Sequence, residues 1–275
     1  MLEPVRIALV LSAGGLRGAA HVGVLHELTS RGIRIDAIVG VSAGAVIGAY
    51  YAAVGLGIDE LLDDAERFRG RHLLTYSINV QLGYRFERRI ARWCGVIPHR
   101  LRQLESANFH SLHHGVQRLG IVCHDLASGQ PHYFSSTTDH GVALSDAVRA
   151  SASIPHLFPA VKVSSGGEAL RLTDGGLSDA VPIAFARSPQ IGATHVVVSD
   201  CRWIGRVEPT DAHTVWIRPR LAGIGTLWSS TRGLAAAVED GAAAVTPAIL
   251  DRVAEWFRCR QPAGDTADAI RYAQG

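Results

Sequence analysis

A serine between small residues is the group in this 275-residue chain best suited to do chemistry. Residues 40–44 read Gly-Val-Ser-Ala-Gly, so that Ser42 follows a β-branched run over 35–41 and precedes an Ala- and Gly-rich run over 43–54. A strand that delivers a serine onto a tight turn with a helix directly behind it is a nucleophile elbow. The helix N-terminus directs free N–H groups at the serine, and small residues let the turn close. The pattern predicts that Ser42 is a nucleophile, supported by Gly40, Ala43 and Gly44.

The glycine-rich segment 13–18, Ala-Gly-Gly-Leu-Arg-Gly, suits the stabilisation of negative charge. Consecutive glycines let backbone N–H groups converge on one external point, and the dipole of the following helix favours an anion there. A phosphate-cradling turn is the alternative, but the segment has neither G-x-G-x-x-G nor G-K-[ST] spacing. Arg17 either holds the loop by hydrogen bonds or contacts an anionic group, and Gly18 supports the turn. We therefore expect an oxyanion hole whose donors are the N–H groups of Gly14, Gly15, Leu16 and Ala43.

Asp174 offers a carboxylate for proton transfer; it follows a short predicted strand and precedes Gly175 and Gly176. In isolation, D-G-G is a common turn. A doubly wound sheet, however, gathers the loops at the carboxyl ends of its strands on one edge, so Asp174 is expected to meet Ser42 and the glycine-rich segment there. A nucleophile, oxyanion donors and a carboxylate in one place form the pattern of acyl transfer.

The elements that must position these groups alternate between strand and helix through residue 55. This order predicts a right-handed crossover and a mostly parallel sheet, hence an α/β fold. We expect about six strands flanked by helices in a single domain over 1–275, and an Arg- and His-rich region 56–118 of surface helices and loops, with a lid as one arrangement. Further strands are predicted at 5–11, 119–123, 132–134, 160–163, 169–172 and 194–198. Helices are predicted at 20–28, 43–54, 144–152 and 234–257, the last within a C-terminal helical extension over about 224–258.

Composition excludes several classes of function. The net charge is only +2 and Lys162 is the one lysine, so no basic block suggests nucleic-acid binding. Four cysteines without a C-x-x-C pair argue against structural zinc and indicate buried or free thiols of a reducing compartment. We expect no metal and no cofactor.

The apolar segments favour a cytoplasmic protein. The apolar run Ile7–Leu11 is too short for a signal peptide. Residues 37–58 carry no charge and are long enough for a membrane span, but their mixture of strand-type and helix-type composition favours a buried strand followed by a buried helix. Any membrane contact is expected to be peripheral, at the inner membrane surface. The Arg-rich region 67–102 either meets anionic headgroups there or is a solvated surface helix.

Four ordered blocks of the chain resemble the patatin-like phospholipase family, and the likeness covers residues 5 to about 200. The blocks are residues 12–21, 40–44, 153–159 and 174–176. The resemblance implies a three-layer architecture and a Ser-Asp dyad, with Ser42 as nucleophile and Asp174 as base. It also implies metal-independent hydrolysis of lipid acyl esters, with a fatty-acyl ester or phospholipid as substrate.

The chain departs from the family pattern at two positions. Ala13 stands where the family usually has glycine, and because alanine is still small we expect activity to survive. Asp179 stands where asparagine is usual, and a second carboxylate near Asp174 is expected to raise the pKa of Asp174 and shift the pH optimum upward.

Three alternatives remain open from the sequence. A Ser-His-Asp triad would use one of the thirteen histidines, such as His21, His156 or His195. A non-catalytic scaffold would bind a lipid or protein partner through the same pocket. Thioesterase or protease chemistry would use the same serine on another acyl substrate. The sequence does not fix the oligomeric state.

Overall fold

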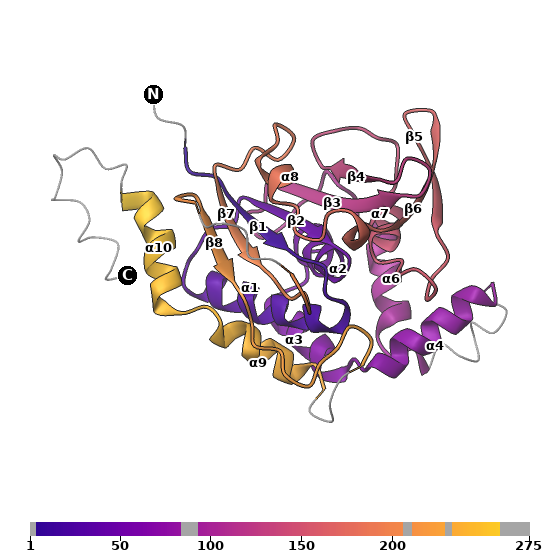
Figure 1. Ribbon diagram of the computed structural model, residues 1–275, viewed down its shortest axis with the longest axis horizontal. Helices are drawn as coiled ribbons and strands as arrows, with labels where there is room; N and C mark the ends of the chain where they lie inside the picture. The colour runs from indigo at the N-terminus through magenta and orange to yellow at the C-terminus, as the bar shows by residue number, and fades with distance from the viewer. Residues whose placement is uncertain (1–3, 84–92, 206–210, 229–232, 259–275) are drawn as a thin grey trace.

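The computed structural model describes residues 4–83, 93–205, 211–228 and 233–258 (Figure 1). An eight-stranded sheet has the strand order β5-β6-β3-β2-β1-β7-β8, and β4 also pairs with β3. Five strands are mutually parallel: β1 (Ile7–Leu11), β2 (Ala37–Val41), β3 (Arg118–Asp125), β7 (His195–Ser199) and β8 (Thr214–Ile217). Three antiparallel strands complete the sheet: β4 (Gln130–Ser135), β5 (Val161–Ser165) and β6 (Glu168–Asp174).

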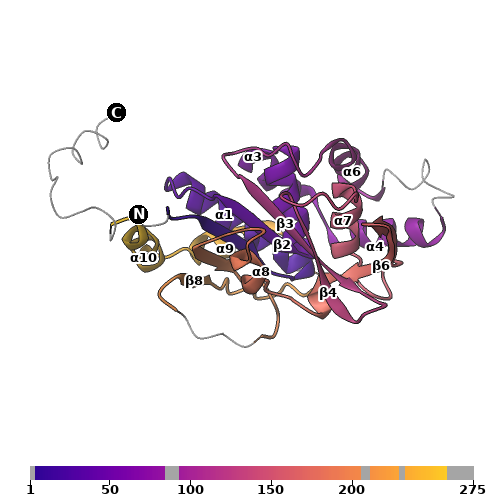
Figure 2. The same cartoon turned by 90° about the horizontal axis from the view of Figure 1, so that it is seen from above.

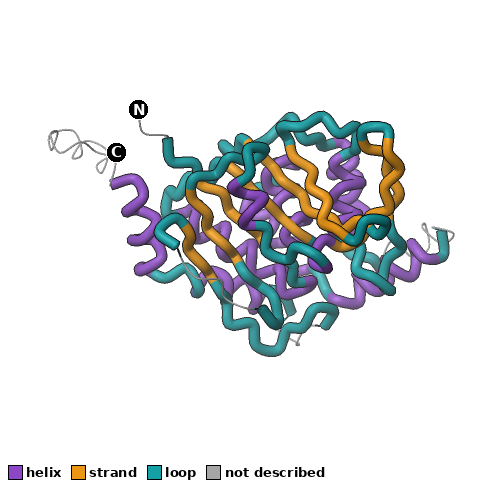
Figure 3. The backbone as a smooth tube through the Cα atoms, turned by 45° about the horizontal axis from the view of Figure 1, so that its top comes forward, coloured by secondary structure: helices purple, strands orange, loops and turns teal. Residues whose placement is uncertain are grey.

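Most of the helices cover one face of the sheet, as Figure 3 shows. In chain order the helices are α1 (Ala20–Ser30), α2 (Ala43–Ala49), α3 (Ile58–Arg67), α4 (Gly70–Gln81), α6 (Ile97–Ser106), α7 (Leu144–Ser151), α8 (Ile183–Arg187), α9 (Ala235–Ala243) and α10 (Pro247–Arg258). A π-helical turn, η2 (Tyr50–Val54), extends α2, and two 3-10 turns, η1 (Gly15–Ala19) and η4 (Gly175–Leu177), border the candidate site. Seen from above, α10 and α4 lie at opposite ends of the molecule (Figure 2).

The core has two main layers because the central strands are apolar on both faces. Ile7, Leu9 and Leu11 of β1 pack with the helices that include α1 and α2. Ala8 and Val10 of the same strand pack with α8 and the segment after it. The three-layer α/β architecture expected from the sequence is confirmed.

The structure differs from the sequence predictions in detail. The sheet has eight strands and not about six. Each of the seven ranges predicted as strands corresponds to one of them, and the eighth, β8, is only four residues long and does not stand out in the sequence. The helix predicted over 234–257 is two helices, since the chain turns between Ala243 and Pro247. In the Arg-rich region, residues 84–92 lie outside the described residues.

The uncharged run 37–58 folds as the buried strand β2 followed by α2 and η2. Across the described ranges, no helix combines the length and the apolarity that a bilayer crossing requires.

Candidate active site

Ser42 lies between the end of β2 and the start of α2, as predicted. Its backbone has φ 57° and ψ −123°, a conformation that non-glycine residues rarely adopt, and its side chain is almost fully buried. The close turn depends on two glycines. A Cβ on Gly40 would lie 2.4 Å from the Gly44 carbonyl oxygen, and one on Gly44 would lie 2.2 Å from that of Leu11. The turn therefore holds the Ser42 side chain at the carboxyl edge of the parallel strands.

Asp174 contacts Ser42 directly. The Ser42 hydroxyl donates a hydrogen bond of 2.6 Å to Asp174 Oδ2, and Asp174 Oδ1 accepts one of 2.8 Å from the Gly176 amide. The approach is close because a Cβ on Gly175 would lie 2.3 Å from the Val122 carbonyl oxygen. The two predicted residues are thus brought together, with one carboxylate oxygen for the serine and the other fixed by the backbone.

The reason for this proximity differs from the one inferred from the sequence. Asp174 does not come from a parallel strand, because β6 runs antiparallel to β3. Strand β3 continues past its pairing with β2, which ends at Val41 opposite Val122, and β6 pairs only with that extension, Cys123–Asp125. The chain thereby returns toward the edge of β2, and Asp174 opposite Cys123 reaches the serine.

Ser151 at the end of α7 and Ser153 just after it support the pair, and neither role was predicted from the sequence. Ser151 accepts a 2.9 Å hydrogen bond from the Ser42 amide and donates one of 2.6 Å to the Val122 carbonyl. The Ser153 carbonyl accepts hydrogen bonds from the Asp174 amide at 3.1 Å and from the Thr173 hydroxyl at 2.6 Å.

Burial raises the pKa of Asp174, and the hydrogen bonds from Ser42 and Gly176 oppose that rise. The direction agrees with the sequence expectation, but the cause does not. Asp179 accepts a 2.9 Å hydrogen bond from the Tyr133 hydroxyl, and its charge is not among the causes of the Asp174 shift. The aspartate at position 179 therefore acts on Tyr133, whose pKa is raised to about 12, first by burial and then by Asp179.

This shift predicts the acid limb of the pH profile. If Asp174 accepts the serine proton, only its ionised form is active, so kcat/KM should fall as the pH drops through the raised pKa. We expect the limb to lie above the aspartate reference of about 3.9. Initial rates with a soluble ester between pH 3.5 and 9 locate it. Asp179→Asn should leave the limb in place, and a downward move of the limb in that variant would contradict the assigned cause.

Of the four predicted donors, the amides of Gly15 and Ala43 lie at helix starts, and the amide of Leu16 is already hydrogen-bonded. Gly15 begins η1 and Ala43 begins α2, and the first amides of a helix have no partner within it. The Leu16 amide, in contrast, donates a 2.9 Å hydrogen bond to the Thr226 carbonyl. The sequence expectation for Leu16 needs correction, because the loop that takes its N–H lies some two hundred residues away in the chain.

Close packing holds the two helix starts together. A Cβ on Gly18 would lie 2.5 Å from the Ala43 Cβ, so η1 and α2 meet only because residue 18 is glycine. Ala13, the family departure, lies against Gly176, where an added Cβ would be 3.0 Å away. Gly14, the remaining predicted donor, lies just before η1 with φ −177°.

Arg17 holds the loop, which resolves the two roles left open by the sequence. Its guanidinium donates to the carbonyl oxygens of Cys201 at 2.9 Å, Leu221 at 3.0 Å and Ile224 at 2.7 Å, and it stacks on the Trp203 ring at 5.0 Å. The side chain is buried. Arg17 therefore ties the candidate oxyanion loop to the segments after β7 and β8.

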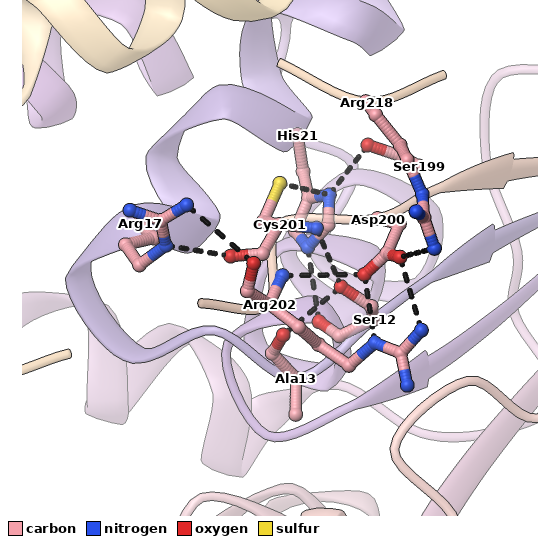
Figure 4. Close-up of polar contacts among 9 residues, drawn as sticks. All are labelled: Ser12, Ala13, Arg17, His21, Ser199, Asp200, Cys201, Arg202 and Arg218. Carbon is pink, nitrogen blue, oxygen red and sulfur yellow. Dashed lines mark hydrogen bonds and ion pairs between the residues drawn. The ribbon is translucent and has the colours of Figure 1, made fainter. Parts of the chain in front are cut away.

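His21 joins the same network behind the loop (Figure 4). Its Nε2 lies 3.0 Å from the Ser12 carbonyl oxygen and its Nδ1 lies 2.7 Å from the Ser199 hydroxyl. A carbonyl only accepts, so Nε2 carries the proton and Nδ1 accepts from Ser199. Burial lowers the pKa of His21 to about 4, which keeps the ring neutral. His21 thus fixes the end of β1, from which the glycine-rich loop starts.

The buried neutral histidine predicts a pH-dependent stability. Because the folded pKa lies below the unfolded value of 6.5, His21 stabilises the fold fully above pH 6.5, and this contribution is lost as the pH falls toward 4. The expected loss by pH 5 is about 2 kcal/mol. Urea unfolding of His21→Gln should show lower stability at pH 7.5 and a smaller fall toward pH 5. An equal fall in both proteins would rule out His21 as the source.

The histidines considered for a triad lie elsewhere. Both ring nitrogens of His21 are engaged as described, and His156 is exposed. His195 is the first residue of β7, so it lies at the amino-terminal end of the parallel strands, whereas Ser42 lies at their carboxyl end. The centre of its ring lies 4.7 Å from the ring centres of His213 and Trp256. Within the described part of the chain, no histidine is among the hydrogen-bond partners of Ser42 or Asp174. The geometry favours a serine and a carboxylate without an intervening imidazole.

Ser42 opens into an apolar cavity of about 390 Å³. One wall is the face of α2 and η2 that carries Ala43, Val46, Ile47 and Tyr50, and much of the remaining lining is aliphatic or aromatic. The wall ends at a polar group of three side chains, Tyr50, Asp64 and Arg100, in which Arg100 binds Asp64 through hydrogen bonds of 2.6 and 3.1 Å. A separate cavity of about 540 Å³ beside α6 includes none of the predicted site residues.

The fold and the site define an α/β protein in which a serine that lines an apolar cavity is hydrogen-bonded to a carboxylate. The model of the patatin-like phospholipase family matches residues 9–187, and the chain belongs to this family. The matched range holds Ser42, Asp174 and the glycine-rich segment.

Individual relatives agree with this membership. The chain is 32% identical over 183 residues to an uncharacterized NTE family protein of Mycobacterium tuberculosis, covering 65% of this chain and 45% of the relative. Over 78 residues it is 40% identical to the lysophospholipase NTE1 of Mycosarcoma maydis, covering 28% of this chain and 4% of that protein. In both cases the match covers less than half of the relative's length.

A solved structure shows a similar fold. VipD from Legionella pneumophila superposes with a TM-score of 0.53 at 15% identity, covering 92% of this chain and 67% of that one. At this identity the likeness supports the fold alone.

Proposed function

We propose that the chain is a serine hydrolase that cleaves fatty-acyl esters, of the phospholipase A or lysophospholipase type, through a Ser42–Asp174 dyad and an acyl-enzyme. The observation that supports this most is the 2.6 Å hydrogen bond to Asp174 from Ser42, which lines an apolar cavity. The family and the name of the lysophospholipase relative point to the same chemistry.

In the proposed first step, Ser42 Oγ attacks the ester carbonyl while Asp174 Oδ2 takes its proton. A carboxylate is too weak a base to form a free alkoxide, so proton transfer accompanies attack. The developing oxyanion is stabilised by N–H groups at the starts of η1 and α2, from Gly15 and Ala43, with Gly14 beside them. Losing one such donor typically costs roughly 10² to 10³ in rate.

In the second step the alcohol leaves with the proton held by Asp174. Water then attacks the acyl-enzyme, Asp174 again takes a proton, and Ser42 is restored as the fatty acid departs. The C–O bond to the alcohol breaks, and a C–O bond from water replaces it. Every proton passes through Asp174 Oδ2, which is the oxygen that Gly176 leaves free.

The cavity wall predicts how the rate depends on acyl length. From Ala43 to Tyr50 the helix rises about 10 Å, and with C–C bonds of about 1.5 Å an extended chain advances about 1.3 Å per carbon, so roughly eight carbons span the wall. Each buried methylene is worth about 0.8 kcal/mol, at most about fourfold in kcat/KM. Beyond that length the chain meets the polar group of Tyr50, Asp64 and Arg100, and the gain should stop.

Hydrolysis of p-nitrophenyl esters of two to sixteen acyl carbons, alongside fatty-acid release from phosphatidylcholine and lysophosphatidylcholine, tests both the function and this limit. We expect kcat/KM to rise to about eight carbons and then level off. Tyr50→Ala should move that point to longer chains. A flat profile, or hydrolysis of thioesters but not oxygen esters, would contradict the proposed substrate class.

A further inference from the structure

Large apolar side chains are exposed along the outer face of α4 and on the loop that adjoins it. They are Leu74 and Ile78 of α4, Leu82 at its C-terminal end, and Leu227 and Trp228, with exposed fractions between 36% and 55%. A group of exposed large apolar side chains on one part of a folded protein indicates a contact site for another molecule. We call these five residues, together with Arg71, the α4 surface.

Helix α4 is apolar on two opposite faces. Leu73, Tyr76 and Val80 line the cavity that contains Ser42. At about 100° per residue, Leu74, Ile78 and Leu82 point away from that row, and Arg71 lies in the same outer stripe. The inner row of Leu73, Tyr76 and Val80 packs around the cavity. The outer row of Leu74, Ile78 and Leu82 is exposed and is not part of the core. Figure 1 shows α4 at the margin of the molecule, away from the central sheet.

The loop that carries Leu227 and Trp228 adjoins the start of α4 beside the candidate site. A Cβ on Gly70, the first residue of α4, would lie 3.0 Å from both the Leu227 carbonyl oxygen and a Leu16 methyl. The preceding residue of the loop, Thr226, accepts the hydrogen bond from the Leu16 amide. The loop at Thr226 and Leu227 therefore contacts both the start of α4 and the candidate oxyanion loop.

The charges of this surface select its partner. Arg71 on the outer stripe and Arg220 at the start of the adjoining loop are both exposed. Residues 70–83 and 219–228 contain no aspartate or glutamate. An apolar stripe with basic residues and a tryptophan is the composition that binds the interface of an anionic bilayer.

We propose that the α4 surface docks on an anionic phospholipid bilayer and brings the cavity next to the lipid. The benefit of docking rests on the proposed function, because the inner row of the same helix lines the cavity that would receive the acyl chain. The apolar side chains of the α4 surface would enter the interface of the bilayer. Arg71 and Arg220 would contact the headgroups.

Co-sedimentation of the full chain with vesicles tests this, using phosphatidylcholine alone and phosphatidylcholine with phosphatidylglycerol. The test variant is Leu74→Glu/Ile78→Glu. The matched control is Leu126→Glu, because Leu126 lies just after β3 and has the same exposed fraction as Leu74, 43%. We expect the wild type and the control to bind the anionic vesicles, with weaker binding in high salt, and the double variant to bind at least tenfold more weakly.

Hydrolysis of a soluble p-nitrophenyl ester separates the docking surface from the proposed function. The rate of hydrolysis should be equal in the wild type, the double variant and the control, since Leu74, Ile78 and Leu126 do not line the cavity. Equal vesicle binding by the double variant and the control would overturn the inference, as would wild-type protein that cleaves the soluble ester but does not sediment. So would a dimer that the double variant loses while vesicle binding persists, because a second copy would then cover the surface. Absence of ester hydrolysis in every protein would count against the function and not against the surface.

Discussion

Ser42→Ala is expected to abolish ester hydrolysis while the protein remains folded. The variant removes the hydroxyl that donates to Asp174, on a residue that lines the cavity, so loss of the nucleophile should lower kcat by roughly 10⁴ or more. The turn itself is built from Gly40 and Gly44 and does not depend on the side-chain oxygen. Rates with p-nitrophenyl octanoate and the unfolding temperature provide the measurement.

Ser30→Ala serves as the control for this variant, because Ser30 ends α1 and is exposed. It should retain full activity. Activity of Ser42→Ala within tenfold of the wild type would mean that another residue is the nucleophile. A biological effect that survives in Ser42→Ala would favour the alternative in which the fold acts as a lipid- or protein-binding scaffold.

Asp174→Asn is expected to lower the rate nearly as far without destabilising the protein at neutral pH. An amide cannot take the serine proton, and loss of a general base of this kind typically costs roughly 10³ to 10⁴. The asparagine can still accept from the Gly176 amide through its oxygen and donate to Ser42 through its nitrogen, so the local hydrogen bonds can be replaced.

The stability of this variant follows from the sign of the pKa shift. Burial raises the folded pKa of Asp174, so the folded state favours the protonated form, and the stability contribution falls as pH rises from the unfolded value through the folded one. At pH 8 the wild type bears the cost of a buried charge that the variant lacks. The unfolding temperature of Asp174→Asn should therefore equal or exceed that of the wild type at pH 8, and this difference should shrink toward pH 4. Activity within tenfold of the wild type would contradict the role of Asp174.

The parts of the fold that could be predicted are those that depend on a short, continuous stretch of the sequence. β1 and β2 are uninterrupted apolar runs, and the change from β-branched to small residues at Ser42 marks the strand-to-helix turn. The meeting of Ser42 with Asp174 was also predicted, but for the wrong reason, since β6 reaches the site as an antiparallel strand. Asp174 reaches Ser42 because β3 extends beyond its pairing with β2 and β6 pairs with the extension. The length of this extension cannot be predicted from a local sequence pattern.

The parts that could not be predicted depend on distant segments. The Leu16 amide looked free because its partner, Thr226, lies in a loop with no regular pattern. The support from Ser151 depends on the end of α7 facing the Ser42 amide, which is a matter of helix packing. The charge of Asp179 predicted an effect on Asp174, whereas its side chain accepts a hydrogen bond from Tyr133.

The most direct test of the central claim, that Ser42 is an activated nucleophile beside Asp174, is labelling of the folded protein with a fluorophosphonate probe followed by peptide mapping. We expect modification of Ser42 alone, with much slower labelling of Asp174→Asn and none of Ser42→Ala. Absence of labelling in folded wild-type protein, or modification of a different serine, would contradict it.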